Sequence, residues 1–144
     1  MILITQKVHK SHSSAAQITL SLSAQERTKS RLNCLADSGE KLLLQLPRGT
    51  VLQDGDILTT DNQQIFMKII AKAEPLVRIK ANSQLTLMRA VYHLANRHVP
   101  LEITINYIAL ERDPVLENLL KQMGLELEYL EVPFFPEQGA YHQH

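Results

Sequence analysis

The stretch Tyr92-His93-Leu94-Ala95-Asn96-Arg97-His98-Val99-Pro100 decides how the second half of this chain folds. The run before it has a helical pattern, because apolar residues recur at three- and four-residue spacing: Leu85, Met88, Val91, Tyr92 and Ala95. The run after it, from Pro100 to Ala109, alternates as a strand does. The stretch therefore predicts a helix end, with His93 inside the helix and His98 beyond it. An imidazole at such a junction is accessible and is held by well-defined elements, which suits a metal ligand.

The rest of the second half alternates between strands and helices. Leu76 to Lys80 alternates with period two, and Asn82 or Ser83 can cap the helix that follows. Asp113-Pro114 is typical of a helix start, and Gly124 can end that helix in the left-handed conformation. A last strand follows, with the alternating residues Leu125, Leu127 and Tyr129. The order β-α-β(-β)-α-β predicts a ferredoxin-like domain.

The first half of the chain has the pattern of a small β domain. Short runs with strand character are separated by turn signals, and they cover residues 18–22, 31–36, 41–46, 57–58 and 65–71. The character of the sequence changes near Ala73-Glu74. We therefore expect an N-terminal β domain over residues 1–73 and a C-terminal domain over residues 74–144. The predicted fold class is α+β.

Composition and charge argue against several classes of protein. The 144 residues carry 15 basic and 15 acidic side chains, and this neutral balance lacks the positive surface of a nucleic-acid binder. No run approaches the roughly 20 apolar residues of a membrane span or has the form of a signal peptide. The single cysteine, Cys34, excludes an intrachain disulfide and a cluster of thiolate ligands. We expect a soluble, cytoplasmic protein that binds neither nucleic acid nor membrane.

Sequence signatures of enzymes are missing. The chain has no His-Glu-x-x-His, no phosphate-binding glycine-rich loop and no Gly-x-Ser-x-Gly elbow. It has only five glycines, so we do not expect backbone amides that cradle a nucleotide phosphate. Carboxylates are scattered, and none pairs with a histidine at a convincing spacing. We expect that the protein is not an enzyme.

The histidines allow more than one interpretation. His98, taken alone, is either a metal ligand or an ordinary surface residue. His93 fits a structural histidine better than a ligand, and it lies five residues from His98, not the four that two ligands on one helical face require. His142 and His144 lie at the end of the chain, where they either wrap onto a metal or have no role.

Taken together with other landmarks, the opening stretch resembles the motif of the UreE family, urease accessory proteins that act as nickel metallochaperones. Residues 92–101 carry the motif. Further landmarks follow in the family's order over nearly the whole chain: Lys29-Ser30-Arg31, Leu46-Pro47-Arg48-Gly49, Asp54-Gly55-Asp56, Asp113-x-Val115-Leu116 and Phe135-x-Glu137-x-Gly139-Ala140-Tyr141. Each piece is short, but the ordered set is specific. The family usually has Gly where Ala95 stands, so we expect the helix to exit through Asn96 in the left-handed region.

The resemblance implies a fold, a ligand set and partners. The N-terminal β domain is similar to a peptide-binding module, and the C-terminal ferredoxin-like domain binds metal and forms a homodimer. The family's ligand is the motif histidine, His98 here, contributed by each protomer at the interface. His142 and His144 would complete that site or deliver the ion to it. The cargo would be Ni(II), handed on to apo-urease through the urease accessory GTPase, UreG.

Elementary coordination chemistry agrees with that role. Imidazole suits Ni(II), and a single ligand per chain binds weakly until a two-fold axis doubles it. The same site should also accept Zn(II) or Cu(II) in vitro, so selectivity must come from partners and metal supply. The alternative is a peptide-binding or scaffolding chaperone whose histidines bind metal only incidentally.

Overall fold

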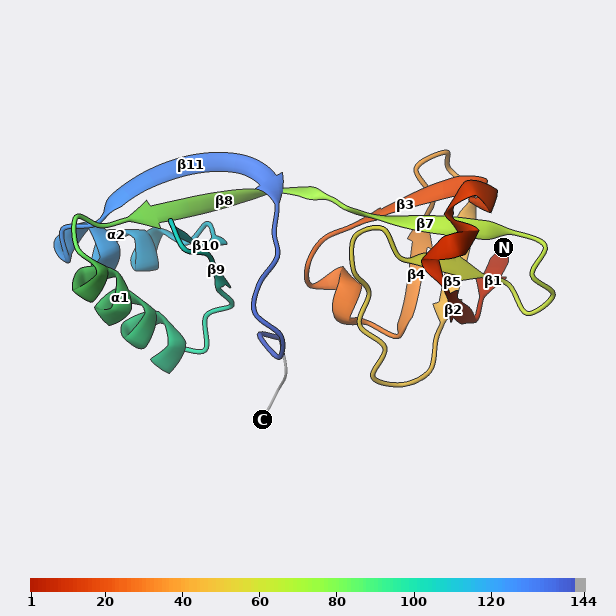
Figure 1. Cartoon of the computed structure of the whole chain (residues 1–144), viewed down its shortest axis with the longest axis horizontal. Helices are drawn as coiled ribbons and strands as arrows, with labels where there is room; N and C mark the ends of the chain where they lie inside the picture. Colours follow the sequence, from red (N-terminus) through yellow and green to blue (C-terminus); the bar gives the residue numbers. More distant parts are fainter. Residues whose placement is uncertain (142–144) are drawn as a thin grey trace. The chain divides into compact units, whose positions relative to one another are not determined.

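A computed structural model describes residues 1–141 of the chain. These residues form two compact units, Met1–Lys72 and a second that begins at Ala73 (Figure 1). The first unit is built of strands with two short 3-10 helices, and the second combines strands with α-helices, which confirms the predicted α+β fold class. Within the described range, no helix is long and apolar enough to span a membrane.

Two sheets share the core of the first unit. One has the strand order β1-β5-β4 and the other has the order β2-β6-β7-β3. The strands are β1 (Ile2–Ile4), β2 (Gln6–Val8), β3 (Ile18–Leu22), β4 (Arg31–Leu35), β5 (Lys41–Gln45), β6 (Ile57–Thr59) and β7 (Phe66–Ala71). The 3-10 helices are η1 (Lys10–Ala15) and η2 (Glu26–Thr28).

Strand alternation decides which side chains enter this core. Leu42 and Leu44 of β5 and Ile69 of β7 point inward, while their neighbours along each strand are more exposed. β1 joins by a parallel pairing that places Ile4 beside Leu44. β1 is only three residues long, too short for an alternating pattern to stand out in the sequence.

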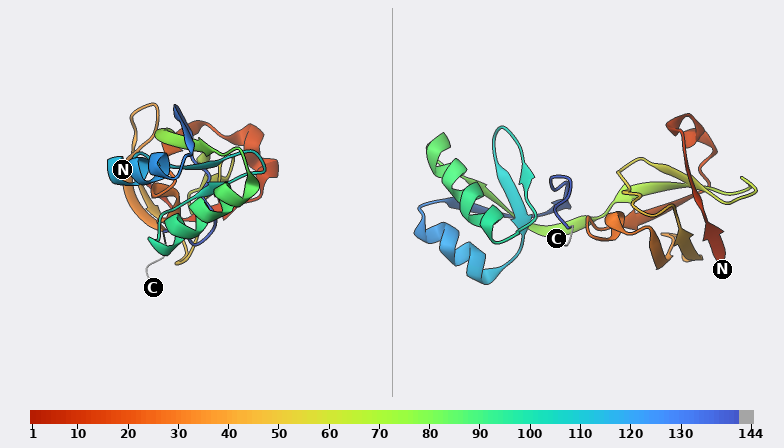
Figure 2. Two further views of the ribbon diagram at one scale, coloured as in Figure 1. Left: turned by 90° about the vertical axis from the view of Figure 1, so that its left-hand side faces the viewer. Right: turned by 90° about the horizontal axis from the view of Figure 1, so that it is seen from below.

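The second unit holds one antiparallel sheet with both helices on the same face. The strand order is β11-β8-β10-β9. The elements are β8 (Ala73–Lys80), α1 (Gln84–Asn96), β9 (Glu102–Ile103), β10 (Ile108–Glu111), α2 (Pro114–Gln122) and β11 (Glu126–Pro133). Figure 2 shows α1 and α2 together on one side of the sheet. The two helices and the sheet share one core. Its buried residues include Val77, Ile79, Ala90, Leu94, Leu110 and Leu120. This is the predicted ferredoxin-like arrangement.

The stretch predicted as one strand from Pro100 to Ala109 is a hairpin. The Thr104 hydroxyl oxygen accepts hydrogen bonds from the amides of Asn106 (3.3 Å) and Tyr107 (3.0 Å) and so bends the chain between β9 and β10. Ile105, at the bend, is 99% exposed. The apolar residues that alternate between Pro100 and Ala109 therefore do not lie on one continuous strand face. Hydrogen bonds from backbone amides to the Thr104 side chain form a turn in place of an extended strand.

Helix α2 begins as the sequence predicts. The Asp113 carboxylate accepts hydrogen bonds from the amides of Val115 (2.9 Å) and Leu116 (3.1 Å), and Pro114 occupies the first turn. Behind the cap, the buried Glu117 carboxylate accepts from the Arg112 guanidinium (3.2 Å).

The end of α2 also follows the prediction. Gly124 adopts φ +83° and donates its amide to the Lys121 carbonyl (3.0 Å). The Leu125 amide reaches back to the Leu120 carbonyl (3.1 Å). These two bonds form a Schellman motif, which satisfies carbonyls that the last turn of a helix leaves without partners.

Candidate metal-binding site

The candidate ligand His98 lies just past the C-terminal end of α1, which runs through Asn96. Two hydrogen bonds close this end. The His98 amide donates to the Ala95 carbonyl (2.9 Å), and the Val99 amide donates to the Leu94 carbonyl (3.2 Å). Bonds with these spacings again form a Schellman motif.

The motif requires one residue in the left-handed conformation, and that residue is His98, at φ +57°. The prediction that Asn96 would take this conformation is wrong, since Asn96 is still helical and Arg97 caps the helix at φ −94°. Val99 packs against the core that buries Leu94, and such an apolar contact accompanies the motif. His98 is exposed on a turn whose backbone conformation is fixed by these contacts.

Helix α1 carries two apolar stripes. One packs against the sheet and consists of Leu87, Ala90, Val91 and Leu94. The other, here called the α1 stripe, consists of Leu85, Met88 and Tyr92, which are 55%, 61% and 63% exposed. The apolar stripe predicted from the sequence is mostly this exposed one, because only Val91 of that set contacts the core. Contiguous exposed apolar side chains are typical of interaction surfaces.

His93 is exposed, whereas we expected a structural histidine that is hydrogen-bonded within the fold. Its ring meets the Tyr92 ring edge-on, with centroids 5.4 Å apart. Its backbone carbonyl accepts a hydrogen bond from the Arg97 guanidinium (2.9 Å). His93 therefore serves the helix end through its backbone, while its ring lies on the surface.

The other two predicted ligands, His142 and His144, lie outside the described residues. Within residues 1–141, no three His, Cys, Asp or Glu side chains gather in a way that could hold a metal ion. A site at His98 would therefore need ligands from a second copy of the chain, from the last three residues or from water.

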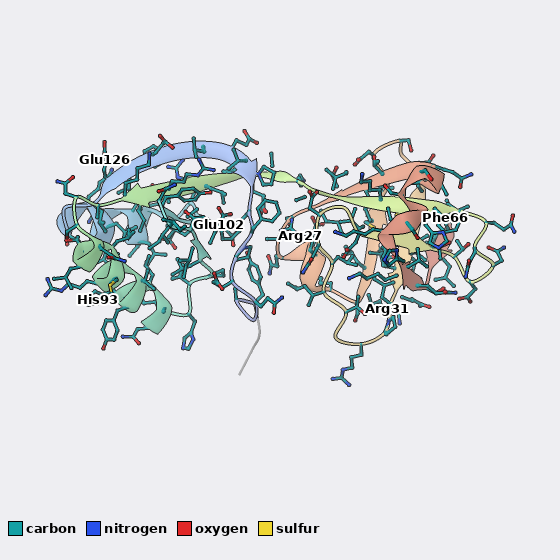
Figure 3. The ribbon with its side chains drawn as sticks, in the orientation of Figure 1. Arg27, Arg31, Phe66, His93, Glu102 and Glu126 are labelled. Carbon is teal, nitrogen blue, oxygen red and sulfur yellow. The ribbon has the colours of Figure 1, made fainter. Side chains whose placement is uncertain are left out.

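A buried carboxylate, Glu102, binds the chain that follows β11 (Figure 3). Glu102 is only 8% exposed on the edge strand β9. Its Oε1 accepts from the Phe135 amide (2.8 Å) and its Oε2 accepts from the Tyr107 hydroxyl (2.8 Å). The hydrogen bond to Glu102, together with burial, raises the pKa of Tyr107, so the phenol stays protonated and donates.

The segment 134–141, here called the docked segment, makes further contacts with the same edge of the sheet. The Glu137 amide donates to the Leu101 carbonyl (2.7 Å), and the Tyr141 hydroxyl donates to the Glu111 carboxylate (2.5 Å). Sequence reasoning missed the role of Glu102. A lone acidic residue in an apolar run carries no signal for a partner 33 residues away.

Comparisons with known proteins cover both units. A family model described as UreE urease accessory protein, N-terminal domain, matches residues 3–71, and the corresponding C-terminal domain model matches residues 74–144. Proteins named urease accessory protein UreE from Thermosynechococcus vestitus and Nostoc sp. are 45% and 47% identical over 144 residues, which is all of this chain and 100% and 98% of theirs. A protein of the same name from Paraburkholderia xenovorans is 47% identical over 129 residues, 88% of this chain and 57% of its own length.

The matches span the first unit, the second unit and the segment that carries the His98 turn. The order of the landmarks, the two-unit architecture and the sequence identity over the whole chain all agree. The chain therefore belongs to the UreE urease accessory protein family.

Proposed function

We propose that the chain binds Ni(II) through His98 and delivers it for assembly of the urease metal centre. The observation that carries this proposal is the exposed His98 in a left-handed position, where glycine is usual. A side chain there costs roughly 1–2 kcal/mol. Glycine would avoid that cost at this position, so the presence of an imidazole there supports a function for the side chain itself.

The proposed site is shared by two copies of the chain. One imidazole binds a metal ion weakly, and a two-fold axis brings a second His98 to the same ion. The α1 stripe supports this pairing, because its three large apolar side chains are exposed on the helix that ends at the His98 turn. A second α1 stripe is a self-complementary partner for such a surface.

The proposed role is transfer rather than catalysis. A site made of imidazoles and water is open, so the ion can leave when a better set of ligands is offered. The partners proposed are the urease accessory GTPase, UreG, and the complex of apo-urease with its accessory proteins. Zn(II) and Cu(II) should compete for the same imidazoles in vitro, because divalent ions differ little in their preference for such ligands except through the general affinity order.

Titration calorimetry of Ni(II) into purified protein tests the proposal. We expect His98→Ala to weaken binding by more than about 100-fold, beyond the 10–100-fold typical of losing an outer-shell partner. His93→Ala is a matched control, because it removes another exposed imidazole from the same helix. Both variants should keep wild-type stability within about 0.5 kcal/mol, as exposed substitutions usually do. Equal nickel affinity in wild type and His98→Ala would refute the proposed ligand.

Proton competition offers a second readout. Metal binds neutral imidazole, so nickel affinity should fall as the pH drops into the range where protons occupy the imidazoles of the metal-free protein. With two copies of His98 on one ion, two protons compete for each metal, and the logarithm of the affinity should fall by about two per pH unit well below that range. A carboxylate site would hold its affinity to about pH 4–5. Affinity that stays flat between pH 7.5 and 5.5 would exclude a histidine site.

A further inference from the structure

We propose that three cationic residues of the first unit, Lys29, Arg31 and Arg48, form a surface that binds a carboxylate-rich segment of a partner protein. This surface, here called the basic ridge, lies at the end of the β4–β5 pair where β4 begins and β5 ends. It uses none of the histidines assigned to nickel, so it goes beyond the proposed function. Its residues come from two of the sequence landmarks, Lys29-Ser30-Arg31 and Leu46-Pro47-Arg48-Gly49.

Hydrogen bonds hold these two landmarks side by side. β4 and β5 pair in antiparallel register, and one step beyond that pairing the Leu46 amide donates to the Ser30 carbonyl (2.8 Å). The loop after β5 is tied to the same segment again, because the Leu52 amide donates to the Arg27 carbonyl (2.8 Å). Arg31 therefore lies near the loop that follows β5 (Figure 3). The fold brings together cations that are distant in the sequence.

Arg48 is carried by a hydrogen-bonded turn. The amide of Thr50 (3.1 Å) and its hydroxyl (2.6 Å) both donate to the Pro47 carbonyl, and Gly49 adopts φ +87°. These features are those of a type II turn with Arg48 at its second position. The turn and the two backbone bonds at the ends of the loop fix the backbone under Arg48. Binding through this side chain therefore orders less of the chain than binding through a mobile loop would.

The charges of the basic ridge are free for a partner. Lys29, Arg31 and Arg48 are exposed, and within residues 1–141 none of the three forms an ion pair or a side-chain hydrogen bond. The carboxylate that is nearest along the chain is already engaged, because Glu26 Oε1 accepts from the Ser23 amide (2.9 Å). The ridge thus presents three cations whose charged groups make no contact with the fold.

The third landmark of the first unit, Asp54-Gly55-Asp56, shows the contrast. Its two carboxylates are used by the fold: Asp54 accepts from the Ala71 amide (2.8 Å), and the buried Asp56 accepts from the Gln53 amide (2.7 Å). Folding alone explains that landmark. It does not explain the charged groups of the basic ridge, which supports a role for them in binding.

The kind of charge indicates the kind of partner. Residues 1–72 carry nine basic and six acidic side chains, a net charge of +3, whereas residues 73–144 carry six and nine, a net charge of −3. Two of the three ridge cations are arginines, whose planar guanidinium groups bind carboxylates through paired hydrogen bonds. A nucleic acid fits less well, because three cations neutralise few phosphates and the segments 27–31 and 46–52 hold no aromatic ring for base stacking. An acidic protein segment fits best.

NMR spectra of the amides of full-length, metal-free protein, titrated with a hexaglutamate peptide, test the proposal. We expect shifts concentrated in residues 28–31 and 46–51, and none with hexaglutamine. Arg31→Gln and Arg48→Gln should each weaken hexaglutamate binding about threefold, as the loss of an exposed ion pair does, and the double variant about ninefold. About 1 M NaCl, which shortens the Debye length to about 3 Å, should remove most of the binding.

Lys41→Gln is the matched control. Lys41 is an exposed cation on the same strand, β5, and lies about 13 Å along it from Gln45, at the end away from the basic ridge. It removes the same charge, so it should leave the affinity for hexaglutamate nearly unchanged. Thermal denaturation checks that each variant folds. Arg48→Gln alters only an exposed turn side chain, so it keeps the test available if Arg31→Gln folds poorly.

The outcomes are distinct from those of the nickel experiments. If Lys41→Gln weakens binding as much as Arg48→Gln, net charge alone attracts the peptide and the proposal is overturned. Shifts that lie outside the basic ridge, or no shifts at millimolar hexaglutamate, overturn it as well. Single-stranded hexathymidylate that binds as tightly as hexaglutamate would make the ridge a general polyanion surface and refute the assignment to a protein partner. Loss of nickel binding in His98→Ala leaves all these results unaffected.

Discussion

The two helices of the second unit end in the same hydrogen-bonded turn but with different residues at its left-handed position. Helix α2 ends with Gly124 at φ +83°, whereas α1 ends with His98 at φ +57°. Nothing lies within 4 Å of a Cβ placed on Gly124, so space does not explain the glycine there and its backbone conformation does. The comparison teaches that the second unit uses this turn after both α1 and α2, with glycine at the left-handed position after α2 and a larger, less favoured residue there after α1.

The helices also differ in how their beginnings are held. Helix α2 starts with a carboxylate cap at Asp113, and the buried Glu117 ties its first turn to Arg112. Helix α1 starts with a single hydroxyl cap, in which Ser83 accepts from the Thr86 amide (3.2 Å). Polar contacts therefore fix α2 more firmly, while α1 depends more on its apolar contacts with the sheet.

The largest expected effect concerns the polar anchor of α2. Glu117→Ala removes an acceptor used by the Arg112 guanidinium and by the Asp113 amide (2.6 Å). Hydrogen bonds to a buried charge are worth more than ordinary ones, so the free energy of unfolding should fall by about 3 kcal/mol. Urea denaturation measures this, with Glu128→Ala on the exposed side of β11 as a control that should change it by less than about 0.5 kcal/mol. A loss below about 1 kcal/mol for Glu117→Ala would mean that α2 is not held mainly by this carboxylate.

The next largest effect concerns Gly124, the residue at the left-handed position after α2. Gly124→Ala should lower the free energy of unfolding by roughly 1–2 kcal/mol, because the Cβ strains a left-handed backbone even where space is free. Gly124→Asn should cost less, since asparagine tolerates this conformation better. The same denaturation experiment decides the matter. If the two variants were equally stable, the conformational explanation of Gly124 would be lost.

The reciprocal substitution sharpens the comparison at α1. His98→Gly should raise the free energy of unfolding by about 1 kcal/mol, because glycine adopts the left-handed conformation without strain. The same variant should lose nickel binding under the proposed function. Thermal denaturation and nickel titration of one sample would show both. If the His98→Gly protein is more stable than wild type yet does not bind nickel, the loss of nickel binding is not caused by unfolding. If His98→Gly is less stable than wild type, the imidazole also stabilises the fold.

A smaller effect on the free energy of unfolding should appear at acidic pH. Burial acts to raise the pKa of Glu117, but the hydrogen bonds from Arg112 and the Asp113 amide outweigh it and the net pKa is lowered. A carboxyl group with a lowered folded-state pKa contributes stability that is fully present above about pH 4.3, its usual unfolded value, and lost as the pH falls through the folded pKa. Urea denaturation between pH 6 and 3 should therefore show a steeper loss in wild type than in Glu117→Gln. Parallel curves would mean that other carboxyl groups dominate acid unfolding.

Local signals predicted α2 and failed at α1 for a physical reason. Asp113, Pro114 and Gly124 fix a helix start and end through contacts within one turn, and the structure confirms all three. The exit of α1 depends on Val99 packing onto a core that forms only when the sheet is present, so the choice of Asn96 as the left-handed residue was wrong.

The spacing of apolar residues likewise predicts helix α1 but not which of its faces packs against the sheet. Two stripes with helical spacing exist on this segment, and the sequence does not say which one the sheet covers. The Thr104 turn was missed because a threonine hydroxyl competes with a strand pattern that is otherwise regular. The exposed place of His98 beyond the helix agrees with the sequence interpretation, while its role as a ligand, together with those of His142 and His144, stays a prediction.

The exposed α1 stripe has a consequence for how the protein responds to dilution. Under the proposed pairing, Leu85, Met88 and Tyr92 lose contact with water only when a second copy covers them, so the paired state gains by mass action. The midpoint of thermal unfolding should then rise with protein concentration, and nickel should bind more tightly in concentrated samples than in dilute ones. A shared ion would be released wherever the pair separates, which makes the abundance of the chain itself a control on how long each ion is held.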